Sequence, residues 1–153
     1  MWTTLFGLTN VIALFGWVLL AALPRKPLVT TSILYLGVAL LCVAYTIMFA
    51  LLFSGSLDPG LVAGAKSVDV SDYSIPGIRV LFQSDGGIVL GWTHYLAFDL
   101  FTGLWIAKDA DAKSFSRIVQ LPILFATFLA GPIGLLLWLV IRESRARKQG
   151  RPA

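Results

Sequence analysis

The chain has 153 residues, of which 58% are hydrophobic and only 13% are charged, a composition that excludes an ordinary soluble globular domain. Its formal net charge of +4 is concentrated in the C-terminal tail beside an apolar run, so it bears on membrane topology and argues against a nucleic-acid partner. One cysteine and one histidine exclude a disulfide within the chain and an ordinary zinc site. We therefore predict an all-α polytopic membrane protein without a cofactor.

The hydropathy pattern predicts a single membrane domain over residues 1–153 with four transmembrane helices. The first covers residues 5–23 and ends at Pro24-Arg25-Lys26-Pro27, where two prolines around a basic pair form a helix stop. The second, 33–53, contains no charged residue. The third covers 88–107 and the fourth 121–141, and each is about long enough to cross a bilayer as a helix.

A polar segment, residues 54–87, separates the second and third predicted spans and is rich in Gly, Ser and Asp. It is longer than the usual structureless loop inside a compact domain. Ile78 to Phe82, with Arg79 among apolar residues, is therefore a candidate for a segment lying on the membrane surface. A poorly ordered loop is the alternative, and the sequence leaves both open.

The last predicted span carries two features that bear on helix packing. Ala126, Ala130 and Gly134 recur every four residues, which on one helix gives a stripe that permits close approach of a neighbour. Gly131-Pro132 should kink this helix and free carbonyl groups that need another partner in lipid. The basic tail, 142–153, follows it.

Four spans would place both termini on one side of the membrane. The basic residues fall on both sides, but the tail is the densest basic cluster, so we expect cytoplasmic termini. The N-terminal run lacks the charged leader of a secretory signal and the composition of a transit peptide. We therefore expect an integral protein of a bacterial cytoplasmic membrane.

The third predicted span contains the only histidine of the chain, His94, and the only carboxylate within any apolar run, Asp99. A carboxylate near the middle of a bilayer costs roughly 2.5–3.5 kcal/mol, so such a residue usually faces the bundle interior and has a partner. Five residues separate the two side chains by about 140° around the helix and about 7.5 Å along it. Both can line one wide concavity, and we name them as candidate catalytic residues.

Aromatic residues flank this pair on the same predicted helix. Trp92 and Tyr95 form a stripe with Asp99, whereas Phe98, Phe101 and Trp105 share the side of His94. Asn10 on the first span falls at the depth of His94 and can hydrogen-bond to it. The predicted substrate-binding residues are Asn10, Trp92, Tyr95, Phe98 and Trp105, and such a lining suits a long conjugated or isoprenoid ligand better than an ion. Plain interhelical packing remains an alternative for each.

Residues 92–101, Trp-Thr-His-Tyr-Leu-Ala-Phe-Asp-Leu-Phe, resemble the W-x-H-x-x-A-x-D-L-F signature of the abscisic-acid-deficient-four family of small membrane proteins. Gly131-Pro132-Ile133-Gly134 is similar to the G-P-I-G element of that family. The resemblance implies a role like that of the plant members, which are linked to the conversion of violaxanthin to neoxanthin, an epoxide-to-allene isomerisation. By chemical analogy, Asp99 would activate an epoxide oxygen and His94 would accept a carbon-bound proton.

The predicted function is thus that of a neoxanthin-synthase-like carotenoid isomerase that works by acid–base proton transfer in the membrane. The alternative is a non-enzymatic carotenoid- or lipid-binding protein, or a membrane assembly protein. A proton-coupled carrier is disfavoured because the chain has no internal repeat, unless it forms a homo-oligomer. The expected partners are a lipophilic small molecule and membrane lipids.

Overall fold

The computed structural model describes residues 1–61, 69 and 71–149. Within these residues the fold is all-α, as predicted, and the only β contact is an isolated bridge between Leu61 and Ser84. The helices are α1 (Trp2–Ala22), α2 (Pro27–Ser32), the π-helix η1 (Ile33–Ala39), α3 (Leu40–Phe53), α4 (Ile75–Leu81), α5 (Asp85–Ala112), α6 (Arg117–Leu129) and α7 (Gly131–Gln149).

Two long helices near the N-terminus are apolar and long enough to cross a membrane, α1 and the continuous helix α2–η1–α3 over Pro27–Phe53. Only 28% and 22% of their most apolar windows are buried, so most of their apolar surface lies on the outside of the molecule. They match the runs predicted at 5–23 and 33–53. The second begins earlier than predicted because the fixed φ of Pro27 suits a first helical position.

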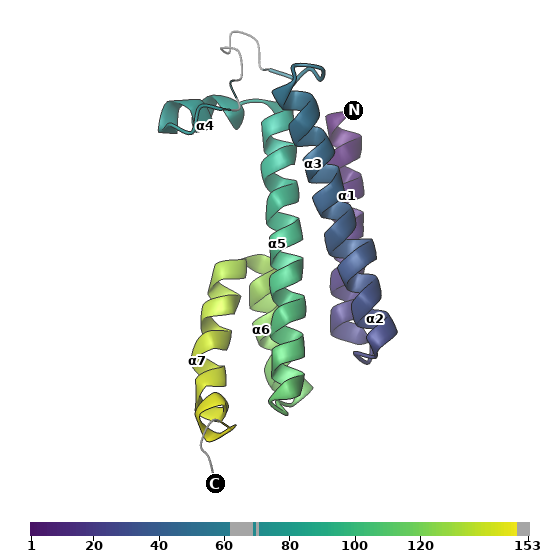
Figure 1. Ribbon diagram of the computed structural model, residues 1–153, viewed down its shortest axis with the longest axis vertical. Coiled ribbons are helices and arrows are strands. Elements are labelled where there is room, and N and C mark those ends of the chain that lie inside the picture. Colours follow the sequence, from purple (N-terminus) through teal and green to yellow (C-terminus); the bar gives the residue numbers. More distant parts are fainter. Residues whose placement is uncertain (62–68, 70, 150–153) are drawn as a thin grey trace.

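These two helices run antiparallel and pack side by side against α5 (Figure 1). Leu100 of α5 is fully buried where the three meet. A Cβ atom at Gly16 of α1 would lie 2.6 Å from Leu100 Cδ2, and one at Gly37 of η1 would lie 2.9 Å from it. The two glycines therefore make the space that Leu100 fills, the close approach that small residues permit between apolar helices.

The region predicted as a fourth span, 121–141, forms two helices instead of one. Ala130 leaves the helical conformation (φ −158°, ψ 86°), and α7 runs back alongside α6 (Figure 1). The expected kink at Gly131-Pro132 is thus a complete reversal. Pro132 favours a break at this point, because in a continuous helix its ring would clash with the carbonyl of Phe128. Ala126, Ala130 and Gly134 consequently do not form a stripe on one helix.

The α6–α7 hairpin enters the bundle and leaves it at the same end. With 13 residues, α6 is about 20 Å long, shorter than the roughly 30 Å of a hydrocarbon core. Its turn lies beside the middle of α5, and α7 ends at the end of the bundle opposite to the N-terminus (Figure 1). The N-terminus and the end of α7 thus lie at opposite ends of the molecule, whereas four spans would bring both termini to the same end.

The hairpin depends on a glycine in α7. A Cβ atom at Gly134 would lie 2.4 Å from the backbone nitrogen of Thr127, so Gly134→Ala forces the two helices apart. We expect this variant to lose about 2 kcal/mol of stability, the usual cost of overpacking, measured by thermal unfolding in detergent. Gly7→Ala is the control, because nothing lies within 4 Å of that position. Equal stability of the two variants would contradict the packing described here.

The polar segment before α5 contains a short helix that lies across the end of the bundle (Figure 1). It is α4, which begins after Ser74, whose hydroxyl caps the Gly77 N–H at 3.2 Å. This helix covers most of the segment proposed to lie on the membrane surface, and Ile75 and Ile78 on it are exposed. Residues 62–68 and 70 lie outside the described residues, so the alternative of a poorly ordered loop is not addressed there.

Candidate functional site

The two candidate catalytic residues of α5 lie in different surroundings. The His94 side chain is exposed, and its ring packs 4.6 Å from that of Phe98 and 5.6 Å from that of Tyr45, measured between centroids. Asp99 is only 8% exposed and lies against the turn between α6 and α7. The structure therefore separates the imidazole from the carboxyl group, where a shared concavity was predicted.

The Asp99 carboxyl group lies against the start of α7, beside the backbone N–H of Gly131, which is the group placed to donate to it. A Cβ atom at Gly131 would lie 1.9 Å from Asp99 Oδ1, so only glycine lets the carboxylate approach this closely. The N-terminus of a helix carries a partial positive charge, which favours a carboxylate there. Asp99 thus acts as a helix cap supplied by a different helix.

The other N–H groups at this turn are satisfied locally. Ala130 donates to the carbonyl of Ala126 at 2.8 Å, and both Ile133 and Gly134 donate to the carbonyl of Ala130. Pro132 has no N–H to satisfy. Among the N–H groups described at this turn, that of Gly131 makes no backbone hydrogen bond within the hairpin, and the Asp99 carboxyl group lies beside it. The buried carboxylate of Asp99 therefore has a structural reason to be there.

Tyr95 holds the other side of the same turn. Its hydroxyl donates to the carbonyl of Leu129, the last residue of α6, at 2.9 Å, and also lies beside the Asp99 carboxyl group. A phenol has one proton, so in this geometry the proton serves Leu129. Asp99 Oδ2 is buried without a hydrogen-bond partner among the described residues. Tyr95 and Asp99, one helical turn apart on α5, together fasten α6 and α7.

The predicted stripe of Trp92, Tyr95 and Asp99 is present and extends to α1. Trp92 stacks on Tyr95 at 5.2 Å, and its indole N–H donates to the side-chain oxygen of Asn10 at 3.1 Å. The Asn10 amide donates to the carbonyl of Phe6 in its own helix. Asn10 therefore pairs with Trp92, and not with His94 as the sequence suggested, because the indole occupies the facing position on α5.

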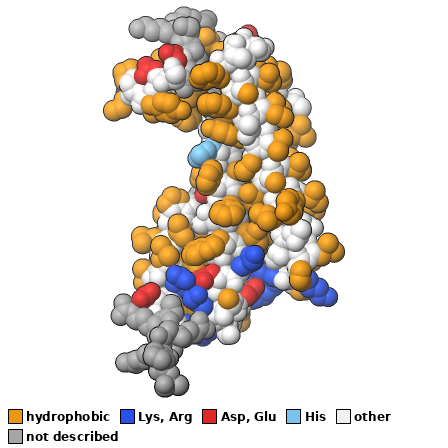
Figure 2. Space-filling model, viewed as in Figure 1, with side chains coloured by type: hydrophobic (Ala, Val, Ile, Leu, Met, Phe, Trp, Pro, Cys, Tyr) orange, Lys and Arg blue, Asp and Glu red, His pale blue; other side chains and the backbone are white. Residues whose placement is uncertain are grey.

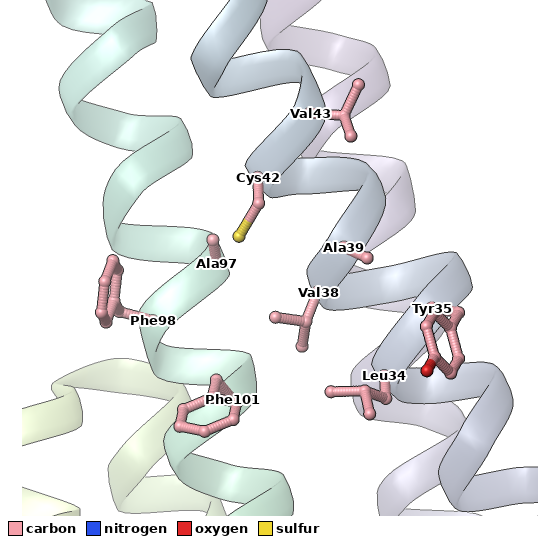
Figure 3. A pocket seen from close by; sticks show the side chains of 9 residues that line it. All are labelled: Leu34, Tyr35, Val38, Ala39, Cys42, Val43, Ala97, Phe98 and Phe101. Atoms are coloured by element: carbon pink, nitrogen blue, oxygen red, sulfur yellow. The ribbon is translucent and has the colours of Figure 1, made fainter.

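A groove runs between α5 and the η1–α3 helix beside His94. Its volume is about 600 Å³, and its lining is apolar. Side chains from both helices point into it (Figure 3). The lining residues are Leu34, Tyr35, Val38, Ala39, Cys42, Val43, Ala97, Phe98 and Phe101. The first four belong to η1, and π-helical segments frequently occur at functional sites because they displace the side chains of one turn.

His94 lies beside this groove, next to Phe98, and is not one of its lining residues. Phe98 both lines the groove and packs against the imidazole, so this one side chain connects the groove with His94. The same face of the molecule is hollowed between α4 and the α6–α7 hairpin, and the only histidine, pale blue in Figure 2, lies in this hollow. His94 therefore faces the hollow and is linked to the groove through its contact with Phe98.

The remaining predicted binding residue, Trp105, lies apart from His94. Its ring packs 5.6 Å from the guanidinium carbon of Arg142 on α7. Tyr45 and Cys42 were not predicted as site residues, because nothing in the uniformly apolar second run indicates which face meets α5. The backbone partners of Asp99 and Tyr95 were also missed, although the Gly131-Pro132 break was a signal that carbonyl and N–H groups there needed partners.

These features define an all-α protein with an apolar exterior, a lipophilic groove and a carboxylate-capped helical hairpin. The chain belongs to the ABA DEFICIENT 4-like family, whose model matches residues 4–138. The matched region includes His94, Asp99 and Gly131-Pro132, so the family resemblance is confirmed, and it indicates a carotenoid-related role. No curated protein and no solved structure matches the chain.

Proposed function

We propose that the protein is embedded in a membrane, holds a carotenoid or related isoprenoid in the groove between α5 and η1–α3, and isomerises it by proton transfer at His94. The observation that carries this proposal is the contact of the exposed His94 ring with Phe98, which lines the groove. It combines an apolar binding surface with a group that can exchange a proton.

The exterior of the molecule supports the membrane assignment. Large apolar side chains are exposed along every long helix, among them Val11, Phe53, Phe98, Phe125 and Val140. In Figure 2 they cover the shaft of the molecule, while lysine and arginine gather at one end. In this arrangement α1, Pro27–Phe53 and α5 cross the bilayer, and the α6–α7 hairpin is re-entrant. At 28 residues, or about 42 Å, α5 is long enough to cross.

The groove fits an elongated apolar molecule. Its volume of about 600 Å³ lies within the usual range for ligand sites of about 300–1,000 Å³. In this proposal the polyene of a carotenoid enters the groove from the lipid and extends beyond it, with one end group of the ligand beside His94.

His94 can carry out a redox-neutral isomerisation without a cofactor. In an epoxide-to-allene conversion, the imidazole takes a carbon-bound proton, and the released electron pair forms a new double bond as the C–O bond breaks. The imidazolium then gives the proton to the oxygen, so the product is an isomer of the substrate. Such proton transfer by a positioned histidine typically contributes 10²–10⁴-fold to a rate.

Asp99 has a different role in this proposal from the acid that sequence analogy suggested. Its carboxylate is engaged by the Gly131 N–H, so it positions the hairpin that forms the floor of the hollow. The same observation favours the second candidate function, a non-enzymatic carotenoid-binding protein, because Asp99 is buried against the hairpin and does not serve as the acid that the analogy required. The isomerase and the non-enzymatic binding protein would hold the same ligand. They differ only in whether His94 transfers a proton from it and back to it.

Occupancy of the groove can be tested in a carotenoid-producing host. The Cys42 side chain is exposed and points into the groove, so Cys42→Phe should fill it (Figure 3). We expect the pigment that copurifies with this variant to fall about 10-fold, for a steric cost of about 1–3 kcal/mol, measured by absorbance and mass spectrometry.

The matched control for this experiment is Val18→Phe. Val18 is also exposed and lines a second apolar groove, between α1 and α6, with a volume of about 380 Å³. Both variants should unfold at the wild-type temperature. Undiminished pigment in Cys42→Phe, or an equal loss in both variants, would show that the α5 groove is not the binding site.

A further inference from the structure

The charged side chains of the protein are divided between its two ends. At the end where α1 and α5 finish and the hairpin begins, seven basic residues stand against three acidic ones among the residues whose side chains the structure describes. These basic residues are Arg25, Lys26, Lys108, Lys113, Arg117, Arg142 and Arg145. At the α4 end the described charged residues are Arg79 and four aspartates, Asp58, Asp69, Asp72 and Asp85. Lysine and arginine are visibly gathered at the first end in Figure 2.

We call the end of the molecule that carries these seven basic residues the basic rim. Hydrogen bonds between helices hold part of it in place. Arg25, in the turn after α1, pairs with Asp111 of α5 at 2.8 Å. Arg117 at the start of α6 donates to the carbonyl of Leu23 at the end of α1. Arg145 of α7 donates to the carbonyl of Ser114 at 2.6 Å. The rim is therefore one continuous surface built from four helices.

Asp109 joins α7 to this rim. It lies 2.7 Å from Lys113 and 2.7 Å from Arg142, and it accepts a hydrogen bond from the indole N–H of Trp138. Burial acts to raise the pKa of Asp109, but the hydrogen bonds and charges of Arg142 and Lys113 outweigh it and hold the pKa below its ordinary value. Asp109 is therefore ionised at neutral pH, and it anchors the end of α7 at the basic rim.

The re-entrant hairpin is what gathers these residues on one side. A single helix over 121–141 would carry Arg142 and Arg145 to the α4 end and divide the basic residues between the two faces. Because α7 turns back at Gly131, both arginines join the turns after α1 and α5 (Figure 1). Positive residues close to membrane spans favour the cytoplasmic side and the anionic lipids there.

We infer that the basic rim faces the cytoplasm and the anionic headgroups of that leaflet, with the N-terminus and α4 on the opposite side. This orientation rests on the membrane assignment made above. In this orientation the N-terminus and the end of α7 lie on opposite faces of the membrane. In the alternative orientation both termini lie in the cytoplasm, so an experiment that locates each end distinguishes the two.

Single-cysteine labelling tests the orientation. In a Cys42→Ala background, Ser56→Cys reports on the α4 end and Ala112→Cys on the basic rim, since both positions are exposed. In intact bacterial cells, a membrane-impermeant maleimide should label Ser56→Cys at least 10-fold more than Ala112→Cys, and permeabilisation should equalise them. A green fluorescent protein fused to the C-terminus should fluoresce, as it does when it folds in the cytoplasm.

The opposite labelling ratio would overturn the orientation. Labelling of Ser56→Cys together with a non-fluorescent fusion, and with activity of an alkaline phosphatase fused at the same place, would overturn the re-entrant course of the hairpin. Extraction of the protein from membranes by alkaline carbonate is a separate result, because it would overturn the membrane assignment on which the inference rests.

Discussion

Asp99→Ala is expected to destabilise the protein by about 2 kcal/mol and to loosen the α6–α7 turn. The substitution leaves the Gly131 N–H without its acceptor in apolar surroundings, and an unpaired buried backbone donor costs about 1–3 kcal/mol. The Ala130 carbonyl, the nearest backbone acceptor described at the turn, already accepts the N–H groups of Ile133 and Gly134. Thermal unfolding in detergent and hydrogen exchange at residues 131–134 measure the two effects.

Asp99→Asn is the informative companion to this variant. Its side-chain oxygen can still accept the Gly131 N–H, and asparagine is as good a helix cap as aspartate, so stability should be retained. Isomerisation should be retained too, because in our proposal Asp99 positions the hairpin and transfers no proton. A stable Asn variant that no longer converts its substrate would assign Asp99 a chemical role. An Ala variant as stable as the wild-type protein would show that the cap contributes nothing.

The sequence was sufficient to predict the helices whose hydropathy is uniform and whose ends are marked. The runs at 5–23 and 33–53 became helices because Pro24 and Pro27 interrupt an otherwise continuous apolar stretch. The reversal at Ala130 was not predicted, because a hydropathy average is the same for one long helix and for two short helices folded together. Gly131-Pro132 marked the position of the break but not its angle.

The sequence pattern also could not predict that Asp99 packs against the turn of the α6–α7 hairpin. The cost of a carboxylate in an apolar helix correctly indicated that Asp99 has a partner. The group beside it is a backbone N–H more than thirty residues away in the chain. Amino-acid composition does not indicate which backbone groups a side chain will contact. The most conspicuous titratable neighbour, His94, was therefore taken as its companion, although the five-residue spacing already placed the two about 140° apart.

His94→Gln is expected to lower the rate of carotenoid isomerisation by 10²–10⁴-fold while the pigment is still retained. Glutamine approximates the size and polarity of the imidazole but cannot take up a proton at neutral pH. The groove is apolar and does not depend on this side chain for its lining, so binding should change little. Product formed per unit of membrane protein, separated by chromatography from extracts of a carotenoid-producing host, gives the rate.

Trp105→Phe is the control for this variant, because Trp105 is an aromatic residue of the same helix that packs near Arg142 and away from the groove. It should convert the pigment at the wild-type rate. If His94→Gln binds pigment and also converts it at that rate, proton transfer at His94 is wrong and the non-enzymatic binding function is the better account. If the variant loses both pigment and conversion, His94 contributes to binding, and the groove must extend over the imidazole into the hollow beneath α4.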